Sequence, residues 1–270
     1  MICVLGDAHL DVIVRASWPP AEDTDTQATT SVGVGCQAAN VAVWVAALGE
    51  RCRLIAARGT DLGADLVFAE LDRRGVELVG PVLVGRTGVV VSVSDGGGQR
   101  SMLTDRGVGT ELSADDIADE WLDECDWLHL PAYSLAPDPV RGAALAAAEA
   151  ARRRSARLSL DLSSTALIEA YGPGEFDKLI AGLRPDVVFG TEAEVALVGV
   201  ERLRVLSKQL VTKLGAAGVR VAGRHYPALP TAPVDATGAG DAFAAGYLAG
   251  GIELGLQAAA RAVAKMGAMP

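Results

Sequence analysis

Short apolar segments alternate with longer segments of helical composition along most of this chain, and this alternation limits its fold more than any other feature. The apolar segments predict strands at Ile2–Leu5, Arg53–Ala57, Trp127–Leu130, Leu158–Leu162, Val187–Phe189 and Leu210–Thr212. Helices are expected at Asn40–Leu48, at Ala64–Arg74, from Pro139 to about Arg154, and from about Glu192. Strands that alternate with helices predict an α/β fold, with a mostly parallel central sheet covered by helices on both faces.

Composition agrees with this fold and excludes several classes of function. Half of the 270 residues are hydrophobic but only 4% are aromatic, which suits Val-rich strands under Ala-rich helices. The net charge of −10 argues against a general nucleic-acid binder. The four cysteines form no C-x-x-C pair and are not clustered with the histidines in the sequence, so neither a zinc site nor a disulfide framework is indicated.

The sequence gives no sign of a membrane segment. No apolar run approaches the roughly 18 residues that a membrane span requires. The apolar opening Ile2–Leu5 stops at Gly6 and lacks a basic segment before it, so it predicts a first strand and not a signal peptide. We therefore expect a cytoplasmic protein with no membrane partner.

Two β-rich stretches interrupt the alternation. Thr87–Ser94 and Gln99–Asp105 flank Asp95-Gly96-Gly97-Gly98, which is a strong hairpin signal. Asp11–Val14 and Thr29–Val34 bracket a polar stretch that contains prolines, and they are candidates for strands beside that hairpin.

These stretches have two interpretations. About residues 11–34 and 85–107 would form a small β-sheet lid, or they would extend the main sheet with antiparallel strands. An exposed β-edge invites pairing, so a homodimer through the lid is also expected on the first interpretation. In both cases residues 1–270 form a single α/β domain.

The most specific feature is the glycine-rich loop Thr237–Asp241, which runs directly into a segment of helical composition. Gly238 and Gly240 flank Ala239 and leave the amides of residues 239–241 uncovered at the first helical turn, where the helix dipole favours an anion. No lysine follows the second glycine, so the loop is not a Walker-type phosphate loop.

Asp241 places a carboxylate beside this anion site. Such a carboxylate can take the proton of a hydroxyl while that oxygen attacks a phosphoryl group held by the same amides. The helix N-terminus is expected to keep Asp241 ionised, which also makes it a weaker base. The alternative is that Asp241 only caps the helix and that the glycines only turn the chain.

Four motifs together resemble the ribokinase-like (PfkB) family of carbohydrate kinases. Val234–Phe243 is similar to the family's C-terminal signature, and Gly6–Asp11 is similar to its opening G-D-x-x-x-D motif. Gly35–Ala42 resembles its first signature, a loop of small residues that leads to an asparagine, and Gly59–Gly63 resembles its G-x-D-x-x-G-like turn. The motifs occur in the family's order and span essentially the whole chain.

This resemblance implies a ribokinase-like fold with a β-sheet lid, and ATP-dependent phosphorylation of a hydroxyl on a small sugar-like substrate. Asp241 would be the catalytic base, and Gly238, Ala239 and Gly240 would form the anion hole. Substrate binding is implied for Asp11, Gly35 and Asn40, and Arg106 is a further candidate because it lies at the end of the predicted lid hairpin. Of these, Asp11 and Asn40 would hold hydroxyls, and Arg106 would pair with a carboxylate or phosphate of the substrate. Taken alone, they also fit a strand end, a helix cap and a solvated rim residue.

The nucleotide side departs from the family pattern. Thr212 and Gly215 correspond to the family's T-x-G-x-x-G turn, but Lys213-Leu214 adds an apparent extra residue between them. Both residues, together with Thr237, would bind ATP. A plain strand and tight turn is the alternative for this segment.

Two cations are implied. Mg²⁺ is expected with ATP, and Glu194 would organise it through water, as in the family's N-x-x-E motif. Thr191 replaces the asparagine of that motif and can cap the helix instead. A monovalent cation, such as K⁺, is implied near Asp235 and the Thr237 carbonyl, with a capping role for Asp235 as the alternative.

Three other functions are alternatives to a sugar kinase. A nucleoside kinase of the same fold would need aromatic side chains to stack on a base, and Trp18 is the main candidate in the lid region. An NAD-dependent oxidoreductase would need G-x-G-x-x-G after the first strand, which this sequence does not provide. A ligand-binding protein that lost catalysis stays open because of Thr191, although Asp241 and its glycines are intact.

Overall fold

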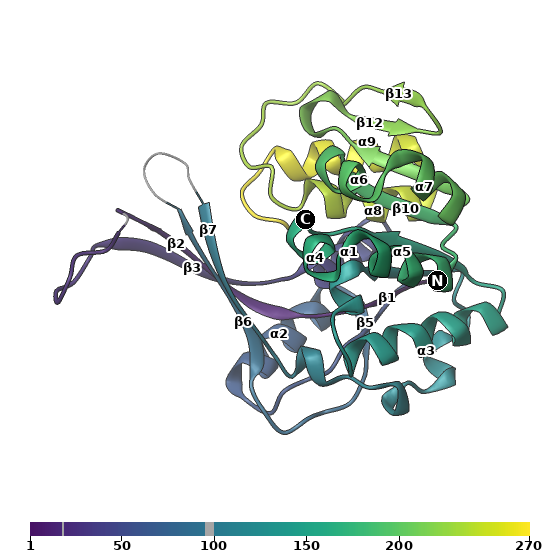
Figure 1. Cartoon of the computed structure of the whole chain (residues 1–270). Coiled ribbons are helices and arrows are strands. Elements are labelled where there is room, and N and C mark those ends of the chain that lie inside the picture. Colours follow the sequence, from purple (N-terminus) through teal and green to yellow (C-terminus); the bar gives the residue numbers. More distant parts are fainter. Residues whose placement is uncertain (18, 95–99) are drawn as a thin grey trace.

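The computed structural model describes residues 1–17, 19–94 and 100–270. Within these ranges the main sheet has nine strands (Figure 1), in the order β13 (Arg224–Tyr226), β12 (Val219–Val221), β11 (Gln209–Lys213), β10 (Val187–Thr191), β9 (Arg157–Asp161), β8 (Trp127–Pro131), β1 (Ile2–Leu5), β4 (Cys52–Ile55) and β5 (Val76–Val79). The strands from β11 to β5 are parallel, and only β12 and β13 pair antiparallel. The predicted mostly parallel sheet is confirmed.

Helices cover both faces of this sheet. One hydrophobic core lies under α1 (Gln37–Ala47), α2 (Leu62–Arg73), α8 (Ala239–Gly250) and α9 (Ile252–Val263). The other lies under α3 (Val140–Arg153), α4 (Thr165–Tyr171), α5 (Pro173–Leu183), α6 (Glu192–Val198) and α7 (Val200–Leu206). Strand β1 serves both cores, because Val4 packs in the first and Leu5 in the second, as the alternation of a strand buried on both faces requires.

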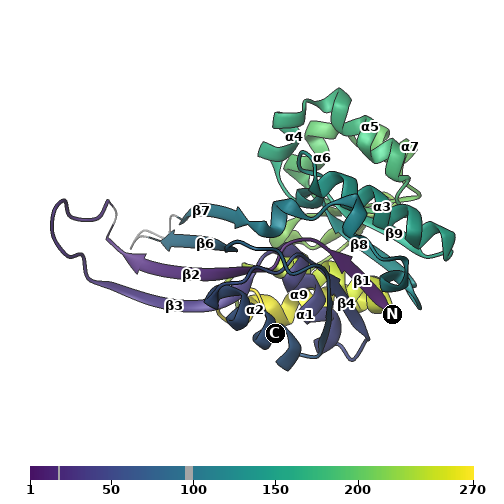
Figure 2. The ribbon, with the colours of Figure 1, turned by 90° about the horizontal axis from the view of Figure 1, so that it is seen from below.

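The β-rich stretches form a second, separate sheet. Its order is β3 (Ala28–Gly35), β2 (His9–Ala16), β6 (Thr87–Ser94) and β7 (Arg100–Gly107). Strands β2 and β6 pair parallel, and the two outer pairs are antiparallel. In Figures 1 and 2 this sheet stands off to one side of the main domain, so the alternative of an extended main sheet is wrong. The hairpin turn at residues 95–99 and Trp18 lie outside the described residues.

Asp61, in the G-x-D-x-x-G-like turn, ties the small sheet to the main domain. Its carboxylate accepts from the Ala64 amide at 3.0 Å and so caps α2. The same carboxylate accepts from the Thr87 hydroxyl at 2.7 Å and from the Thr87 amide at 3.1 Å, at the start of β6. One side chain therefore fixes both the helix and the base of the second sheet.

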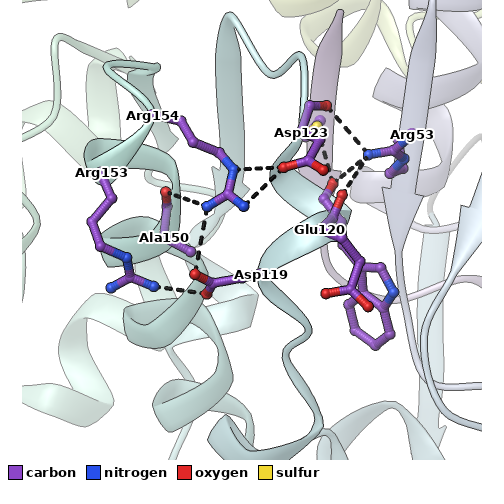
Figure 3. A network of polar contacts seen from close by, with 9 residues as sticks. Arg53, Asp119, Glu120, Asp123, Ala150, Arg153 and Arg154 are labelled. Atoms are coloured by element: carbon purple, nitrogen blue, oxygen red, sulfur yellow. Dashed lines mark hydrogen bonds and ion pairs between the residues drawn. The ribbon is translucent and has the colours of Figure 1, made fainter.

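A polar network holds the connection between β7 and β8 against the main domain (Figure 3). Arg53 on β4 donates to the Trp121 carbonyl at 2.7 Å and to the Asp123 carbonyl at 3.4 Å. Arg154, at the end of α3, pairs with the Asp123 carboxylate at 2.8 Å and with Asp119 at 3.6 Å. The connection contains the short 3₁₀ helices Val108–Glu111, Ala114–Asp116 and Asp119–Leu122; two further ones are Ala132–Leu135 and Gly215–Ala217.

The four cysteines are free, and Cys3, Cys52 and Cys125 are buried. A search for membrane spans through the described ranges finds no helix with the length and apolar character needed to cross a bilayer.

Candidate active site

Gly238 sets the start of α8. It precedes the helix with a φ of 75°, and a Cβ on it would lie 2.6 Å from the Cα of Ala268, so only glycine fits. The Ala239 amide donates to the Ala236 carbonyl at 3.3 Å, contrary to the expectation that this amide is uncovered. The first-turn amides of Gly240 and Asp241 therefore make up the candidate anion site.

Asp241 receives a hydrogen bond from the other end of the sequence. Asn40 Nδ2 donates to Asp241 Oδ2 at 2.8 Å, across a separation of 201 residues. Helix α1 begins at Gln37, three residues before its predicted start, so Asn40 lies within the first turn and is not a cap. Gly238 occupies the cap position of α8. The first turns of α1 and α8 thus meet at the carboxylate.

Burial raises the pKa of Asp241 to about 7, and the Asn40 hydrogen bond and the positive charge of Lys213 only partly oppose this rise. The expectation that the helix N-terminus makes this carboxylate a weaker base is therefore wrong. A pKa near neutrality makes Asp241 a stronger base, while it is still ionised in a large share of molecules at pH 7.

Lys213 is a site residue that sequence reasoning missed. Its Nζ donates to Asp161 Oδ2 at 2.7 Å; the Asp161 side chain is fully buried and that of Lys213 is 14% exposed. The same Nζ lies 3.4 Å from the position that a Cβ on Gly240 would take. The residue treated as an extra one in the turn therefore lies against the anion loop.

Thr212 and Gly215, which were expected to bind ATP, are not among the described residues that contact Asp241. The Thr212 side chain lines a pocket with Arg204 and Gln209, on the α7 side of the sheet, because side chains alternate along β11. The structure does not bring Thr212 to Asp241. Gly215 opens the turn after β11 with a φ of 58°.

Glu194 and Thr191 form a capping box at the start of α6. Glu194 Oε2 accepts from the Thr191 amide at 2.7 Å, and Thr191 Oγ1 accepts from the Glu194 amide at 3.4 Å. Thr191 therefore caps the helix, as its substitution for the family asparagine suggested. Glu194 is buried, and its charge acts on Lys213.

Asp235 organises the loop before α8. Its Oδ1 accepts from the Thr237 amide at 2.9 Å and from the Thr237 hydroxyl at 2.6 Å, and its Oδ2 accepts from the Gly267 amide at 3.0 Å. The loop is thus bound to the C-terminal segment. Asp235 and Thr237 also line a cleft of about 1140 Å³, and Asp11 and other residues of the small sheet line the same cleft.

Gly35 makes room for Asp11. The two residues lie on the adjacent strands β3 and β2, and a Cβ on Gly35 would be 2.0 Å from Asp11 Oδ2. Any side chain at this position would displace the carboxylate. The role of Gly35 in the first signature is therefore to let Asp11 approach the backbone closely.

A buried cluster surrounds Asp7, which sequence reasoning did not single out. Arg106 Nε donates to Asp7 Oδ2 at 2.7 Å, and the guanidinium also donates to the Tyr133 carbonyl at 3.1 Å. Cys36 Sγ lies 3.3 Å from His9 Nδ1, although the two residues are far apart in the sequence. The folded chain thus forms a cysteine–histidine contact that the sequence spacing hides.

This cluster is poorly suited to a metal ion, although ligand atoms of Asp7, His9 and Cys36 lie within 4.8 Å of one another. The Arg106 guanidinium already neutralises Asp7. Burial raises the pKa of the Cys36 thiol, which favours the form that does not bind metals. Burial also lowers the pKa of His9, so its imidazole is neutral near pH 7.

Several buried acceptor atoms near these residues have no hydrogen-bond partner within the described ranges. They are Asp7 Oδ1, Gln37 Oε1 and Asn40 Oδ1. Buried polar atoms normally have a partner, so these atoms indicate a ligand or ordered water. Since all three are acceptors, they suit a ligand rich in donor groups, such as hydroxyls.

Comparisons with known proteins agree with this arrangement. A family model described as pfkB family carbohydrate kinase matches residues 1–269. A fructokinase of Klebsiella pneumoniae is 31% identical over 268 residues, which cover 92% of this chain and 83% of that protein. An ATP-dependent ribose-1-phosphate kinase of Halopiger xanaduensis is 28% identical, over 92% of this chain and 84% of the relative. A candidate ribokinase II from E. coli, solved in complex with ATP and Mg²⁺, shares the fold with a TM-score of 0.86, at 21% identity over 99% of this chain and 94% of its own.

Proposed function

The chain belongs to the pfkB family of carbohydrate kinases, and from this membership we propose that it transfers the γ-phosphoryl group of ATP to a hydroxyl of a small neutral sugar. The observation that carries the proposal is the hydrogen bond between Asn40 and Asp241 at the start of α8. It joins the expected substrate-binding asparagine to the expected base, beside the amides of Gly240 and Asp241.

The mechanism follows from this placement. The Asp241 carboxylate accepts the proton of the substrate hydroxyl as that oxygen bonds to the γ-phosphorus and the bond to the ADP oxygen breaks. The amides of Gly240 and Asp241, at the positive end of the α8 dipole, stabilise negative charge on the transferred group. Asn40 holds the carboxylate in position. Proximity and orientation supply much of the rate in such a transfer.

The E. coli protein of similar fold was solved with ATP and Mg²⁺ bound, and this supports the same two ligands in our proposal. Mg²⁺ prefers oxygen ligands and keeps several waters, and the buried Glu194 carboxylate suits a water-mediated contact. When bound, Mg²⁺ neutralises charge on the phosphates. Potassium near Asp235 stays a prediction, because the carboxylate oxygens of Asp235 already accept three hydrogen bonds from Thr237 and Gly267. Equal activity in potassium and sodium buffers would remove it.

The substrate is proposed to be neutral because the one arginine of the expected substrate set is already paired. Arg106 donates to the Asp7 carboxylate and to the Tyr133 carbonyl. The Asp7 carboxylate therefore largely neutralises the guanidinium of Arg106. Asp11 and Asp241 add negative charge to the same region. A sugar acid or sugar phosphate would meet repulsion there, whereas hydroxyls would satisfy the buried acceptors.

We further propose that the small sheet acts as a lid. Its residue Asp11 lines the same cleft as the loop residues Asp235 and Thr237, and we expect closure of the sheet to bring Asp11 toward a bound substrate. The outer strands β3 and β7 expose Val32 and Leu103, and pairing of such an edge with a second copy would give the predicted homodimer. A cytoplasmic location also stays a prediction.

A panel of acceptors tests the function. ATP consumption would be followed with D-fructose, D-ribose, cytidine, adenosine, ribose 1-phosphate and gluconate. We expect turnover with a neutral sugar. Preference for a nucleoside would favour the nucleoside-kinase alternative, and preference for ribose 1-phosphate or gluconate would contradict the neutral-substrate proposal. ATP binding without turnover of any acceptor would favour a binding protein that has lost catalysis.

A further inference from the structure

The ion pair between Lys213 and Asp161 lies inside the candidate active site. Asp161 ends β9 and Lys213 ends β11, and β10 runs between them. Their Nζ to Oδ2 distance is 2.7 Å, and the aspartate is fully buried. Burying two charges has a large desolvation cost, and apolar residues of similar size often stabilise a fold as well or better. The pair therefore calls for an explanation other than stability.

Lys213 also lies against the anion loop. Its Nζ and its Cδ are 3.4 and 3.5 Å from the place of a Cβ on Gly240. Gly240 supplies one of the two amides that we assign to the phosphoryl group. The ammonium is therefore in the immediate surroundings of the transferred group, in a loop whose own sequence has no lysine.

The carboxylates around Lys213 keep its ammonium group charged. Asp161, Glu194 and Asp241 all act on its ammonium, and together they raise the pKa of Lys213 against the effect of burial. Lys213 therefore stays protonated at neutral pH. The flexible side chain of lysine carries three donors, so it can keep the bond to Asp161 and direct another donor to a phosphoryl oxygen.

We propose that Lys213 is a catalytic residue that contacts the transferred phosphoryl group, and that Asp161 is its positioning residue. This inference rests on the kinase function proposed above. Lys213 supplies, from a neighbouring strand, the positive charge that a Walker loop carries within its own sequence. Negative charge on the phosphoryl oxygens in the transition state is stabilised by this ammonium in a site largely shielded from water.

A structural role and a catalytic role of the Lys213–Asp161 pair predict different effects on kcat when both residues are replaced by apolar ones. In the double variant Lys213→Met with Asp161→Leu, neither member of the pair is left buried without the other, so the fold should keep its melting temperature within a few degrees. If the pair were structural, this variant would also keep kcat. On our proposal its kcat falls by about 10²–10³-fold, as for loss of a transition-state donor, while KM for the sugar stays close to that of the wild type.

Single variants and a control complete the experiment. The single variant Lys213→Arg should have a kcat between those of the double variant and the wild type, because arginine keeps the positive charge but has a different shape. Asp161→Asn should lower kcat without raising KM for the sugar, because it releases the ammonium from its position. Lys208→Met is the control, since Lys208 forms an ion pair with Asp186 at 2.6 Å at the other end of β11 and is exposed. It should leave kcat unchanged.

A binding measurement makes the test independent of the acceptor. ADP with Mg²⁺ and aluminium fluoride imitates the phosphoryl group in transfer, and its affinity can be compared with that of ADP and Mg²⁺ alone by calorimetry. We expect the fluoride to tighten binding to the wild type and to the Lys208→Met control, and to have little effect on the double variant. Equal tightening in the double variant, or a wild-type kcat, would overturn the role of Lys213. Absence of turnover by the wild type with every acceptor would instead contradict the kinase function.

Discussion

Asn40 and Asp241 are 201 residues apart in the sequence, and a 2.8 Å hydrogen bond joins the amide of one to the carboxylate of the other. The bond connects the first turns of α1 and α8. The orientation of the base therefore depends on a residue from the first third of the chain. Asn40 also retains an acceptor, Oδ1, without a hydrogen-bond partner within the described ranges.

Replacement of Asn40 by alanine should impair both binding and chemistry. The variant loses the donor to Asp241 and the acceptor offered to the substrate. We expect KM for the sugar to rise and kcat to fall, each by about tenfold, as for loss of one hydrogen bond to a charged group. Steady-state kinetics with the best acceptor checks this, and an unchanged KM for the sugar would show that Asn40 does not hold the substrate.

The activity should depend on the ionisation of Asp241. A protonated carboxyl cannot accept the hydroxyl proton, and the pKa of Asp241 is raised to about 7. The value of kcat/KM should therefore rise with pH through about 7 and level off above 8. A profile from pH 5.5 to 9 measures this dependence. A profile that stays flat over this range would show that the carboxyl keeps its ordinary pKa in the free enzyme.

The same shift predicts an effect on stability. Because the pKa of Asp241 is higher in the folded state than its ordinary value of 3.8, the folded protein binds this proton more tightly. The resulting stabilisation is complete below about pH 4 and is lost as pH rises through about 7. At pH 8 the wild type holds a poorly solvated charge that Asp241→Asn lacks, so this variant should be more stable by about 1 kcal/mol. Urea unfolding measures this effect. The difference in free energy of unfolding between Asp241→Asn and the wild type should be smaller at pH 5 than at pH 8.

Two glycines of the anion loop should respond differently to alanine. Gly238 has a φ of 75° and lies against the backbone of Ala268, so Gly238→Ala should destabilise the fold by about 2–3 kcal/mol. Gly240 faces the flexible Lys213 side chain at an ordinary contact distance, so Gly240→Ala should cost less than about 1 kcal/mol. The bulkier Gly240→Val should reduce kcat through obstruction of the phosphoryl group. Thermal melts and kinetics of the three variants separate these effects.

The sequence predicted the features that depend on local pattern. Each of the six predicted strands of the parallel series lies within two residues of its predicted position, because apolar runs bounded by glycine, proline and charge mark such strands clearly. The edge strand β5 (Val76–Val79) was not predicted. Asp241 and Asn40 could be assigned to one site in advance because both belong to spaced motifs that resemble one family, although the hydrogen bond between them was not predicted. The separation of the small sheet from the main one could not be decided, because period-2 patterns do not specify a partner strand.

The site residues that sequence reasoning missed are brought together by the fold, and above all by the order of the strands in the sheet. Asp161 and Lys213 meet only because β9 and β11 flank β10 and their side chains stand on the same face of the sheet. The pairing of Asp7 with Arg106 likewise joins the loop after β1 to the end of β7. The direction of the pKa shift of Asp241 was also out of reach, because burial decides it against the helix dipole and burial is set by the tertiary fold.

The kinetics of Asp241→Asn test the central claim most directly. Asparagine preserves the shape of the side chain but cannot accept the hydroxyl proton, so kcat should fall by about 10²–10⁴-fold. The affinities for ATP and for the sugar, measured by calorimetry, should stay within a few-fold of the wild type. A variant with the kcat of the wild type on its best acceptor would contradict the assignment of Asp241 as the base and leave it a structural residue of α8.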